Sequence, residues 1–215
     1  MIATISADIV DSTALSSQGI MKLREGISSF FNDMEHLVPG SWGRLTRGDF
    51  IECVIPDASE ALRIALMLKA RIKSISYGEF INDDSALLTY GARIAIGLGS
   101  MRIVDRQNDI MDGEAIYLSG RQIDKKEAYN KGTLYLCTSL PSKYLCLSAV
   151  CVLTDALFNK MTSKQANVIY YKLLNMKVDE IASLIGIKQS TVSQHSTQAG
   201  WYAVDAALEA FKHSI

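Results

Sequence analysis

The 215-residue sequence lacks the features that would assign it to a specialised class of protein. No apolar run reaches the roughly 18 residues that a membrane-spanning helix needs. The N-terminus shows no basic segment followed by an apolar stretch and a small-residue cleavage site. The formal net charge is −1, so no global basic field attracts nucleic acid. With 48% apolar residues, the composition predicts an ordinary globular, cytoplasmic protein that makes no membrane contact.

Cysteine is also scarce, and its four positions form no Cys-x-x-Cys pair: Cys53, Cys137, Cys146 and Cys151. Each lies among apolar residues, so we expect four buried thiols, with zinc binding and disulfides as less favoured alternatives. The cysteines therefore give no reason to place the protein in an oxidising compartment.

Residues 1–139 alternate between apolar runs and helical periodicity. We expect helices over 15–38, 61–75 and 114–130, and loops over 76–86 and 105–114. Strands are expected over 1–10, on both sides of the turn at Arg47-Gly48-Asp49, over 87–104 with a turn near Gly97 or Gly99, and over 132–139. This order predicts an α/β (α+β) sandwich with a mixed sheet, in the style of ferredoxin-like β-α-β-β-α-β folds.

The composition changes near Leu140, and residues after 153 show only helical patterns. We therefore expect two domains, an α/β domain over 1–145 and an all-α domain over 152–215. No Gly/Ser-rich linker separates them, which favours two parts that pack together.

Residues 162–195 carry the most specific local pattern. Thr162 and Gln165 form a capping box that opens a helix. Ala182, Gly186 and Val192 have the spacing of a helix-turn-helix, because a small residue lets two helices approach, a glycine permits the left-handed turn and an apolar residue holds the second helix in place. The next helix would present polar side chains to a DNA major groove, namely Lys188, Gln189, Ser190, Thr191, Ser193, Gln194 and His195.

The charge of this part is low for a DNA-binding domain. Residues 152–215 contain six Lys, no Arg and five Asp plus Glu, a net of 6 − 5 = +1, whereas strong DNA binders carry a basic stripe. The alternative is a helical hairpin used for packing or dimerisation. A homodimer would help DNA binding by adding two weak half-site contacts. Trp201, Val204, Leu208 and Phe211 share one helix face, which predicts core packing or a contact with a partner chain.

Two aspartates raise a separate question. Asp8 ends the first strand and Asp49 lies in the hairpin turn, and a β-α-β-β unit can bring them together. Two close carboxylates repel unless a proton or a cation lies between them, and Mg²⁺ with a polyphosphate is the usual solution. Arg44 and Arg47 flank the turn and could offset the acids. The alternative is that Asp8 caps the following helix and Asp49 serves the turn.

Four short motifs, in the same order along the chain, resemble those of class III nucleotide cyclases over about residues 1–138: ADIVDSTALS, RLTRGDFIECVI, ARIAIGLGSM and DGEAIYLSGR. With the C-terminal helix-turn-helix added, nearly the whole chain resembles the SatD-like family. This resemblance implies a cyclase-type sheet fused to a DNA-binding-type module.

The resemblance implies roles for single residues. Asp8 and Asp49 match the aspartates that bind Mg²⁺ or Mn²⁺ in cyclases. Thr13 matches the threonine of the phosphate loop, and Arg121 matches the catalytic arginine that contacts the phosphates. Arg47, beside the second aspartate, could also meet a phosphate.

Other positions depart from the cyclase pattern. Tyr117 stands where cyclases have a nucleotide-contacting asparagine, and Leu45 stands at the base-selecting position. Asp11 replaces the glycine of the phosphate loop and adds negative charge where a triphosphate would approach, which weakens binding.

We therefore expect a DNA-binding transcriptional regulator with a cyclase-like domain that senses a ligand, such as a nucleotide, or dimerises. The alternatives are a divergent metal-dependent nucleotidyl cyclase or nucleotide-binding protein, working as a homodimer, and a purely structural interaction protein.

Overall fold

The computed structural model describes residues 1–46, 48–125, 128 and 131–215. Five strands form the central sheet: β1 (Ile2–Ile9), β2 (Trp42–Thr46), β3 (Phe50–Ile55), β4 (Ala92–Gly99) and β7 (Leu134–Thr138). They lie in the order β2-β3-β1-β4-β7, and all neighbours are antiparallel except β4 and β7. The predicted mixed α/β architecture with a mixed sheet is therefore confirmed.

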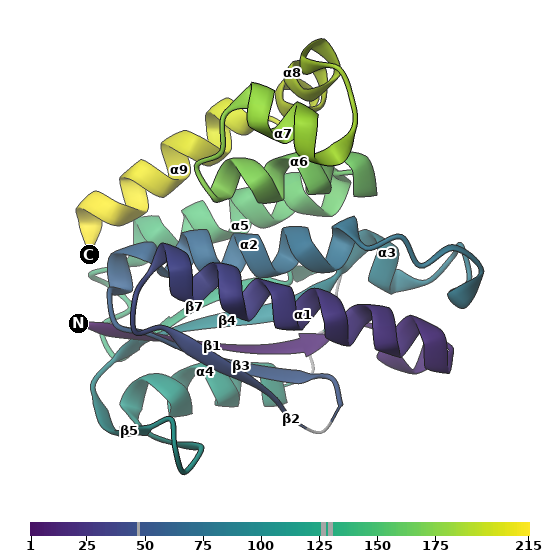
Figure 1. The fold of residues 1–215 in the computed structure, drawn as a ribbon. Coiled ribbons are helices and arrows are strands. Elements are labelled where there is room, and N and C mark those ends of the chain that lie inside the picture. The colour runs from purple at the N-terminus through teal and green to yellow at the C-terminus, as the bar shows by residue number, and fades with distance from the viewer. Residues whose placement is uncertain (47, 126–127, 129–130) are drawn as a thin grey trace.

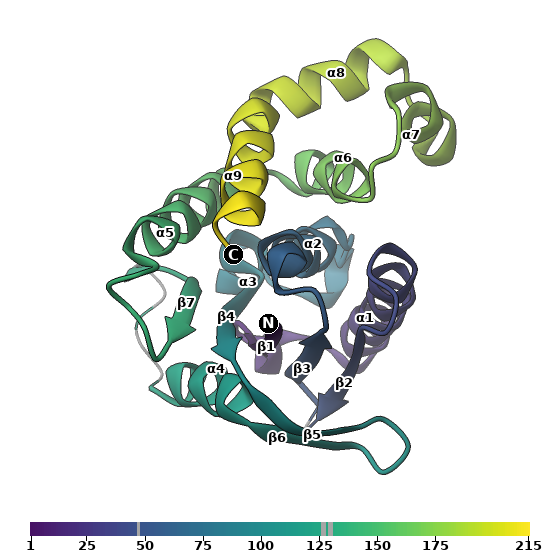
Figure 2. The ribbon, with the colours of Figure 1, turned by 90° about the vertical axis from the view of Figure 1, so that its left-hand side faces the viewer.

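Helices cover both faces of this sheet (Figures 1 and 2). On one face lie α1 (Ser17–Leu37) and α2 (Ala61–Ser74), and on the other lies α4 (Glu114–Asp124). Two further strands, β5 (Met101–Asp105) and β6 (Ile110–Gly113), form an antiparallel ribbon beside α4. The chain thus builds a layer of helix below the sheet and a thicker helical layer above it.

Strand β1 is buried on both faces, and its alternation shows why it tolerates polar residues. The odd-numbered residues from Ala3 to Ile9 are apolar and belong to the main core under α1 and α2. On the opposite face, the hydroxyls of Thr4 and Ser6 lie 3.1 and 2.8 Å from the Ser119 hydroxyl of α4. Buried hydroxyls that pair in this way avoid the cost of an unmet hydrogen bond.

Helix α4 packs unusually close to β4 at Gly97. A Cβ atom added there would overlap the carbonyl oxygen of Ala115 and would come within 2.8 Å of the Thr4 hydroxyl oxygen. Glycine therefore sets the distance between the helix and the sheet.

The C-terminal residues form five helices: α5 (Leu145–Lys160), α6 (Ser163–Leu173), α7 (Val178–Ile185), α8 (Gln189–Gln198) and α9 (Trp201–Ser214). Helix α6 packs on the side of α2 that faces away from the sheet, α9 contacts both α2 and α5, and α5 packs directly against β7 (Figure 2). Buried residues of all three, such as Phe158, Ile169 and Phe211, belong to the same apolar core as the sheet. Helix α2 is accordingly buried on nearly every side, and its buried residues include Lys69 and Lys73.

A buried ion pair joins the two parts of the chain. The Lys69 ammonium on α2 lies 2.8 Å from the Asp155 carboxylate on α5, and both side chains are buried. Asp155 also accepts 2.7 Å hydrogen bonds from the backbone N–H and the hydroxyl of Thr133. Burial alone would raise the pKa of Asp155, but the Lys69 charge and these hydrogen bonds hold it below its ordinary value.

Most predicted elements are confirmed, and three are wrong. Residues 86–90 form the short helix α3 (Ala86–Tyr90), so the predicted strand over 87–104 begins only at Ala92, and the chain turns at Ser100. Residues 110–113, predicted as loop, pair with β5. Helix α4 ends at Asp124, and four residues of the helix predicted over 114–130 lie outside the described residues.

The predicted boundary between two domains lies inside one continuous helix. Helix α5 runs through residues 145–152, between the expected end of the first domain and the expected start of the second. Its buried side packs against β7 and its neighbours α2 and α9. The predicted boundary therefore coincides with no break in the secondary structure of the described residues.

The cysteine prediction holds only in part. Cys53 and Cys151 are buried and Cys137 is half-buried, but Cys146 is exposed on α5. All four thiols are free. No helix within the described residues is long and apolar enough to cross a membrane.

Candidate functional site

Three acidic side chains gather where β1 ends, and each has its own partner. The Asp8 carboxylate pairs with the Arg93 guanidinium on the neighbouring strand β4. Asp49 accepts a 2.7 Å hydrogen bond from the Ser12 hydroxyl. The Asp11 carboxylate accepts a 2.6 Å hydrogen bond from the hydroxyl of Ser85, the residue before α3, while its backbone has a left-handed φ of 54°.

The fold does bring the two predicted metal-binding aspartates to one end of the sheet. The backbone N–H of Ile9, next to Asp8, donates a 3.2 Å hydrogen bond to the carbonyl of Asp49. However, Arg93 supplies the positive charge beside Asp8 that a metal ion would otherwise supply. Among the described residues, no three His, Cys, Asp or Glu side chains form a group suited to a metal ion. The Asp8–Arg93 pair competes with a metal ion for the Asp8 carboxylate, and the Mg²⁺ or Mn²⁺ site stays a prediction.

The other residues predicted around these acids are dispersed. Thr13 is exposed in the short 3-10 turn Ser12–Ala14 after β1. Arg44 does not offset Asp8 or Asp49, because it forms ion pairs with Glu52 and Asp109. Arg47 lies outside the described residues.

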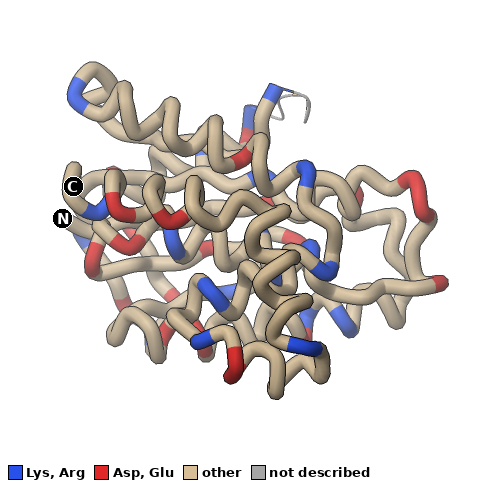
Figure 3. Tube along the Cα trace, turned by 90° about the horizontal axis from the view of Figure 1, so that it is seen from above, with Lys and Arg blue, Asp and Glu red and all other residues tan. Residues whose placement is uncertain are grey.

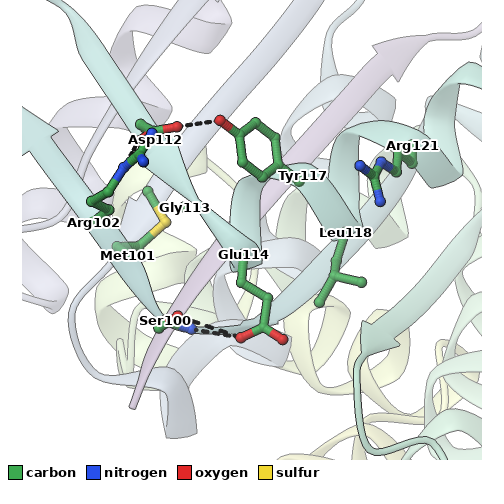
Figure 4. Close-up of a pocket in the computed structure, with 9 residues that line it drawn as sticks. All are labelled: Ser100, Met101, Arg102, Asp112, Gly113, Glu114, Tyr117, Leu118 and Arg121. Atoms are coloured by element: carbon green, nitrogen blue, oxygen red, sulfur yellow. Dashed lines mark hydrogen bonds and ion pairs between the residues drawn. The ribbon is translucent and has the colours of Figure 1, made fainter.

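Tyr117 and Arg121, one helical turn apart on α4, line a single groove instead (Figure 4). A cavity of about 530 Å³ lies between α4 and the β5–β6 ribbon, and a second cavity of about 510 Å³ adjoins it on the side of β2 and β3. Both cavities are lined by these two residues. We call this pair of cavities the α4 groove; it falls in the size range of small-molecule sites.

The side chains of the α4 groove include a fixed polar cluster and an unpaired cation. The Tyr117 hydroxyl donates to the Asp112 carboxylate, which also pairs with Arg102 (Figure 4). These contacts, from Arg102 first and then Tyr117, lower the pKa of Asp112. Arg121 is exposed, and in the described part of the chain it has no hydrogen bond or ion pair. It is therefore available to an anionic ligand.

Asp8, Asp49 and Thr13 do not line the α4 groove. The predicted nucleotide-binding residues thus separate into two places. The partners Arg93 and Asp112 were missed, although Arg93 stands directly opposite Asp8 in the strand register. Sequence reasoning could have found that pairing only by knowing the register of β1 on β4.

The predicted helix-turn-helix spacing gives a compact three-helix unit of α6, α7 and α8. Gly186 ends α7 in the left-handed conformation, with φ 70° and ψ 34°. The N–H groups of Gly186 and Ile187 both donate to the carbonyl of Ala182, which closes the turn. Ala182 and Val192 are buried with Val168 and Ile181 in an apolar cluster separate from the main core.

Helix α8 presents a polar face to solvent at the far end of the molecule from the sheet (Figures 1 and 2). Five of the seven predicted DNA-contacting residues are exposed: Lys188, Gln189, Ser190, Ser193 and Gln194. Thr191 and His195 are half-buried. The Nδ1 atom of His195 is buried without a hydrogen-bond partner among the described residues, so this ring is turned partly toward the three-helix unit.

Positions of Lys and Arg and of Asp and Glu are interspersed along the described part of the chain in the view of Figure 3. Helix α8 itself carries no Asp or Glu, and the exposed Lys188 is its N-cap residue. Asp155, one of the five acids counted in the C-terminal part, is buried in its ion pair. The surface of these helices is therefore slightly more positive than the sequence count alone indicates.

Comparison of the chain with protein-family models, with curated proteins and with solved structures finds no match.

Proposed function

We propose that the protein is a DNA-binding transcriptional regulator in which α7 and α8 act as a helix-turn-helix and α8 enters the major groove. One observation carries this proposal. The turn at Gly186 and the buried cluster of Ala182 and Val192 hold α8 as a rigid, outward-facing helix with an exposed polar face. Such a helix meets the geometric need of major-groove reading.

The chemistry of α8 suits both parts of DNA recognition. Gln189 and Gln194 can read base edges, since an amide can make paired hydrogen bonds to adenine. Ser190, Ser193 and Lys188 can bind phosphates, as can the positive end of the helix dipole. The absence of acidic residues from α8 removes repulsion against the backbone of DNA.

Gel-shift titrations of genomic DNA fragments with the wild type and with Gln194→Ala test this proposal. Loss of a paired base contact costs about 1–3 kcal/mol, so we expect specific affinity to fall by roughly 5–150-fold while affinity for random duplex stays the same. Gln18→Ala provides the matched control, because Gln18 is an equally exposed glutamine on α1. Failure of the wild-type protein to bind any duplex above the random-sequence background at low salt would refute DNA binding.

We also propose that the N-terminal part is a cyclase-like domain of ferredoxin-like type that senses a ligand or dimerises. The β-α-β-β-α-β order and the strand order β2-β3-β1-β4 support this. We assign no metal-dependent step to it, since Arg93 takes the cation position beside Asp8. The cytoplasmic location stays a prediction.

The α4 groove supports a nucleotide as the sensed ligand. The unpaired Arg121 can bind a phosphate and the half-exposed Tyr117 ring can stack on a base. A nucleotide at 100 times its dissociation constant should stabilise the wild type by about 2.7 kcal/mol in a thermal-shift assay. Arg121→Ala should remove that shift, whereas Asp8→Asn and Arg24→Ala should keep it; an unchanged shift in Arg121→Ala would place the site elsewhere.

A further inference from the structure

Helix α5 carries an exposed apolar stripe that the proposed function leaves unused. Its members recur at spacings of three and four residues on the outer side of the helix: Leu145, Cys146, Ala149, Val152, Leu153 and Ala156. Leu145, Val152 and Leu153 are 70%, 60% and 67% exposed. Isolated exposed apolar residues are ordinary, but a contiguous stripe of them marks an interaction surface.

The stripe is unlike a solvated helix face because it has no charge. No Asp, Glu, Lys or Arg occurs from Tyr144 to Thr154, and the first acid, Asp155, points into the core. The opposite side of α5 is held by Leu147, Cys151 and Phe158, which are buried against the rest of the molecule. Helix α5 lies at the edge of the molecule, and its outer side faces no other helix or strand of the described residues (Figure 2).

We propose that this α5 stripe is a self-association surface on which α5 of a second copy lies antiparallel across a two-fold axis. Leu145, Ala149, Val152 and Ala156 are spaced by four, three and four residues, which is the spacing of a helix-pairing seam. Antiparallel pairing centred between residues 150 and 151 sets each large residue opposite a small one. Leu145 then faces Ala156 of the second copy, and Ala149 faces its Val152.

The size of the stripe agrees with a weak dimer. Sixteen residues at 1.5 Å rise give a helix about 24 Å long. Pairing two such helices covers on the order of 500 Å² on each copy, near the lower limit of about 1,000 Å² in total for a specific interface. A weak, reversible dimer is the expected consequence. This inference does not depend on DNA binding, although a dimer would supply two α8 helices for two half-sites.

Sedimentation equilibrium of the full-length protein tests the surface. Val152→Glu places a carboxylate in the seam of each copy and should raise the dimer dissociation constant at least about tenfold. Val104→Glu is the matched control, because Val104 is an exposed valine on the β5–β6 ribbon; it should leave the constant unchanged. Both sites face solvent, and circular dichroism of each variant verifies that it folds.

Crosslinking tests the antiparallel register separately, in a Cys146→Ser background. In the antiparallel pair, the two thiols of Ala149→Cys are offset by three residues, about 4–5 Å, along the helix axis. A short bismaleimide should therefore join them and give a covalent dimer. The two thiols of Ala156→Cys are offset by eleven residues, about 16 Å, and should not be joined by the same reagent. Three results would each overturn the proposal. They are loss of the dimer in Val104→Glu instead of Val152→Glu, a wild-type protein that is monomeric at all concentrations, and binding of the wild type to lipid vesicles through the stripe.

Discussion

At the scale of single residues, two buried lysines distinguish this protein from an ordinary sandwich. Lys69 pairs with Asp155, but Lys73, one turn further along α2, has no acidic partner among the residues that the structure describes. Its ammonium donates instead to the backbone carbonyls of Leu88 and Thr89 in α3. Burial, helped by the nearby charge of Lys69, lowers the pKa of Lys73 to about 8.

This shift predicts a pH dependence of stability. An unfolded lysine titrates near pH 10.4, so between about pH 8 and 10.4 the unfolded chain binds more protons at Lys73 than the folded one. The free energy of unfolding of the wild type, relative to Lys73→Met, should therefore rise with pH in that window, by at most about 1.4 kcal/mol per pH unit. Denaturant titrations of both proteins at several pH values measure this difference. A flat difference would mean that Lys73 is charged normally in the folded state.

Gly97 provides a second test at this scale. Gly97→Ala forces a methyl group against the backbone of α4 and should lower the free energy of unfolding by about 1–3 kcal/mol. Gly120→Ala on α4 is its control, because a Cβ atom there meets nothing within 4 Å and should raise stability by up to about 1 kcal/mol. Equal effects in urea unfolding would contradict the close approach of α4 to β4.

At the scale of elements, the sequence predicts those parts whose pattern is local. Helices α1 and α6 have clear periodicity and caps, and β1 is one apolar run. The prediction failed over 87–91, where an apolar run forms a helical turn capped by Ser85, whose hydroxyl also holds Asp11. It failed again at β6, because pairing with β5 and not alternation makes that strand. In both segments, contacts with other parts of the chain determine the secondary structure.

The N-cap residue of α8 makes a prediction for this element. If Lys188 binds a phosphate, Lys188→Ala should weaken binding about equally on all duplexes and reduce the slope of log affinity against log salt by about 1. Lys131→Ala, an exposed lysine far along the chain from α8, should keep the wild-type slope. Binding isotherms at four salt concentrations distinguish the two. If Lys188→Ala keeps the wild-type slope, residues other than Lys188 bind the phosphates.

At the scale of the whole molecule, the Lys69–Asp155 pair ties the C-terminal helices to the sheet. Asp155→Ala leaves a buried ammonium without its counter-charge and should cost about 3–5 kcal/mol. Adding Lys69→Met should recover most of that loss, since an apolar pair avoids the desolvation of both charges. The exposed pair Arg106–Glu35 is the control, and Arg106→Ala should change stability little. Thermal unfolding of the three variants and the wild type decides whether the pair acts as a unit.

Only part of the candidate sites could be predicted from the sequence. The helix-turn-helix spacing is local, so Gly186 and Val192 were placed correctly. The metal site was inferred from two aspartates without knowledge of their neighbours, and in the structure the Asp8 carboxylate forms an ion pair with Arg93. The α4 groove depends on the β5–β6 ribbon, whose pairing the sequence did not reveal. Long-range register, therefore, is what sequence reasoning lacked.

The double covering of α2 has a practical consequence for anyone who divides this protein. A fragment ending near residue 145 would remove α5, α6 and α9 from α2 and expose the apolar side chains of α2 that they cover. Such a fragment is expected to aggregate on expression, and calorimetry of the intact chain should show one endotherm for both parts. Fragments that keep the sheet but lack α5–α9 would therefore need surface redesign of α2 before any assay of the isolated α4 groove could be interpreted.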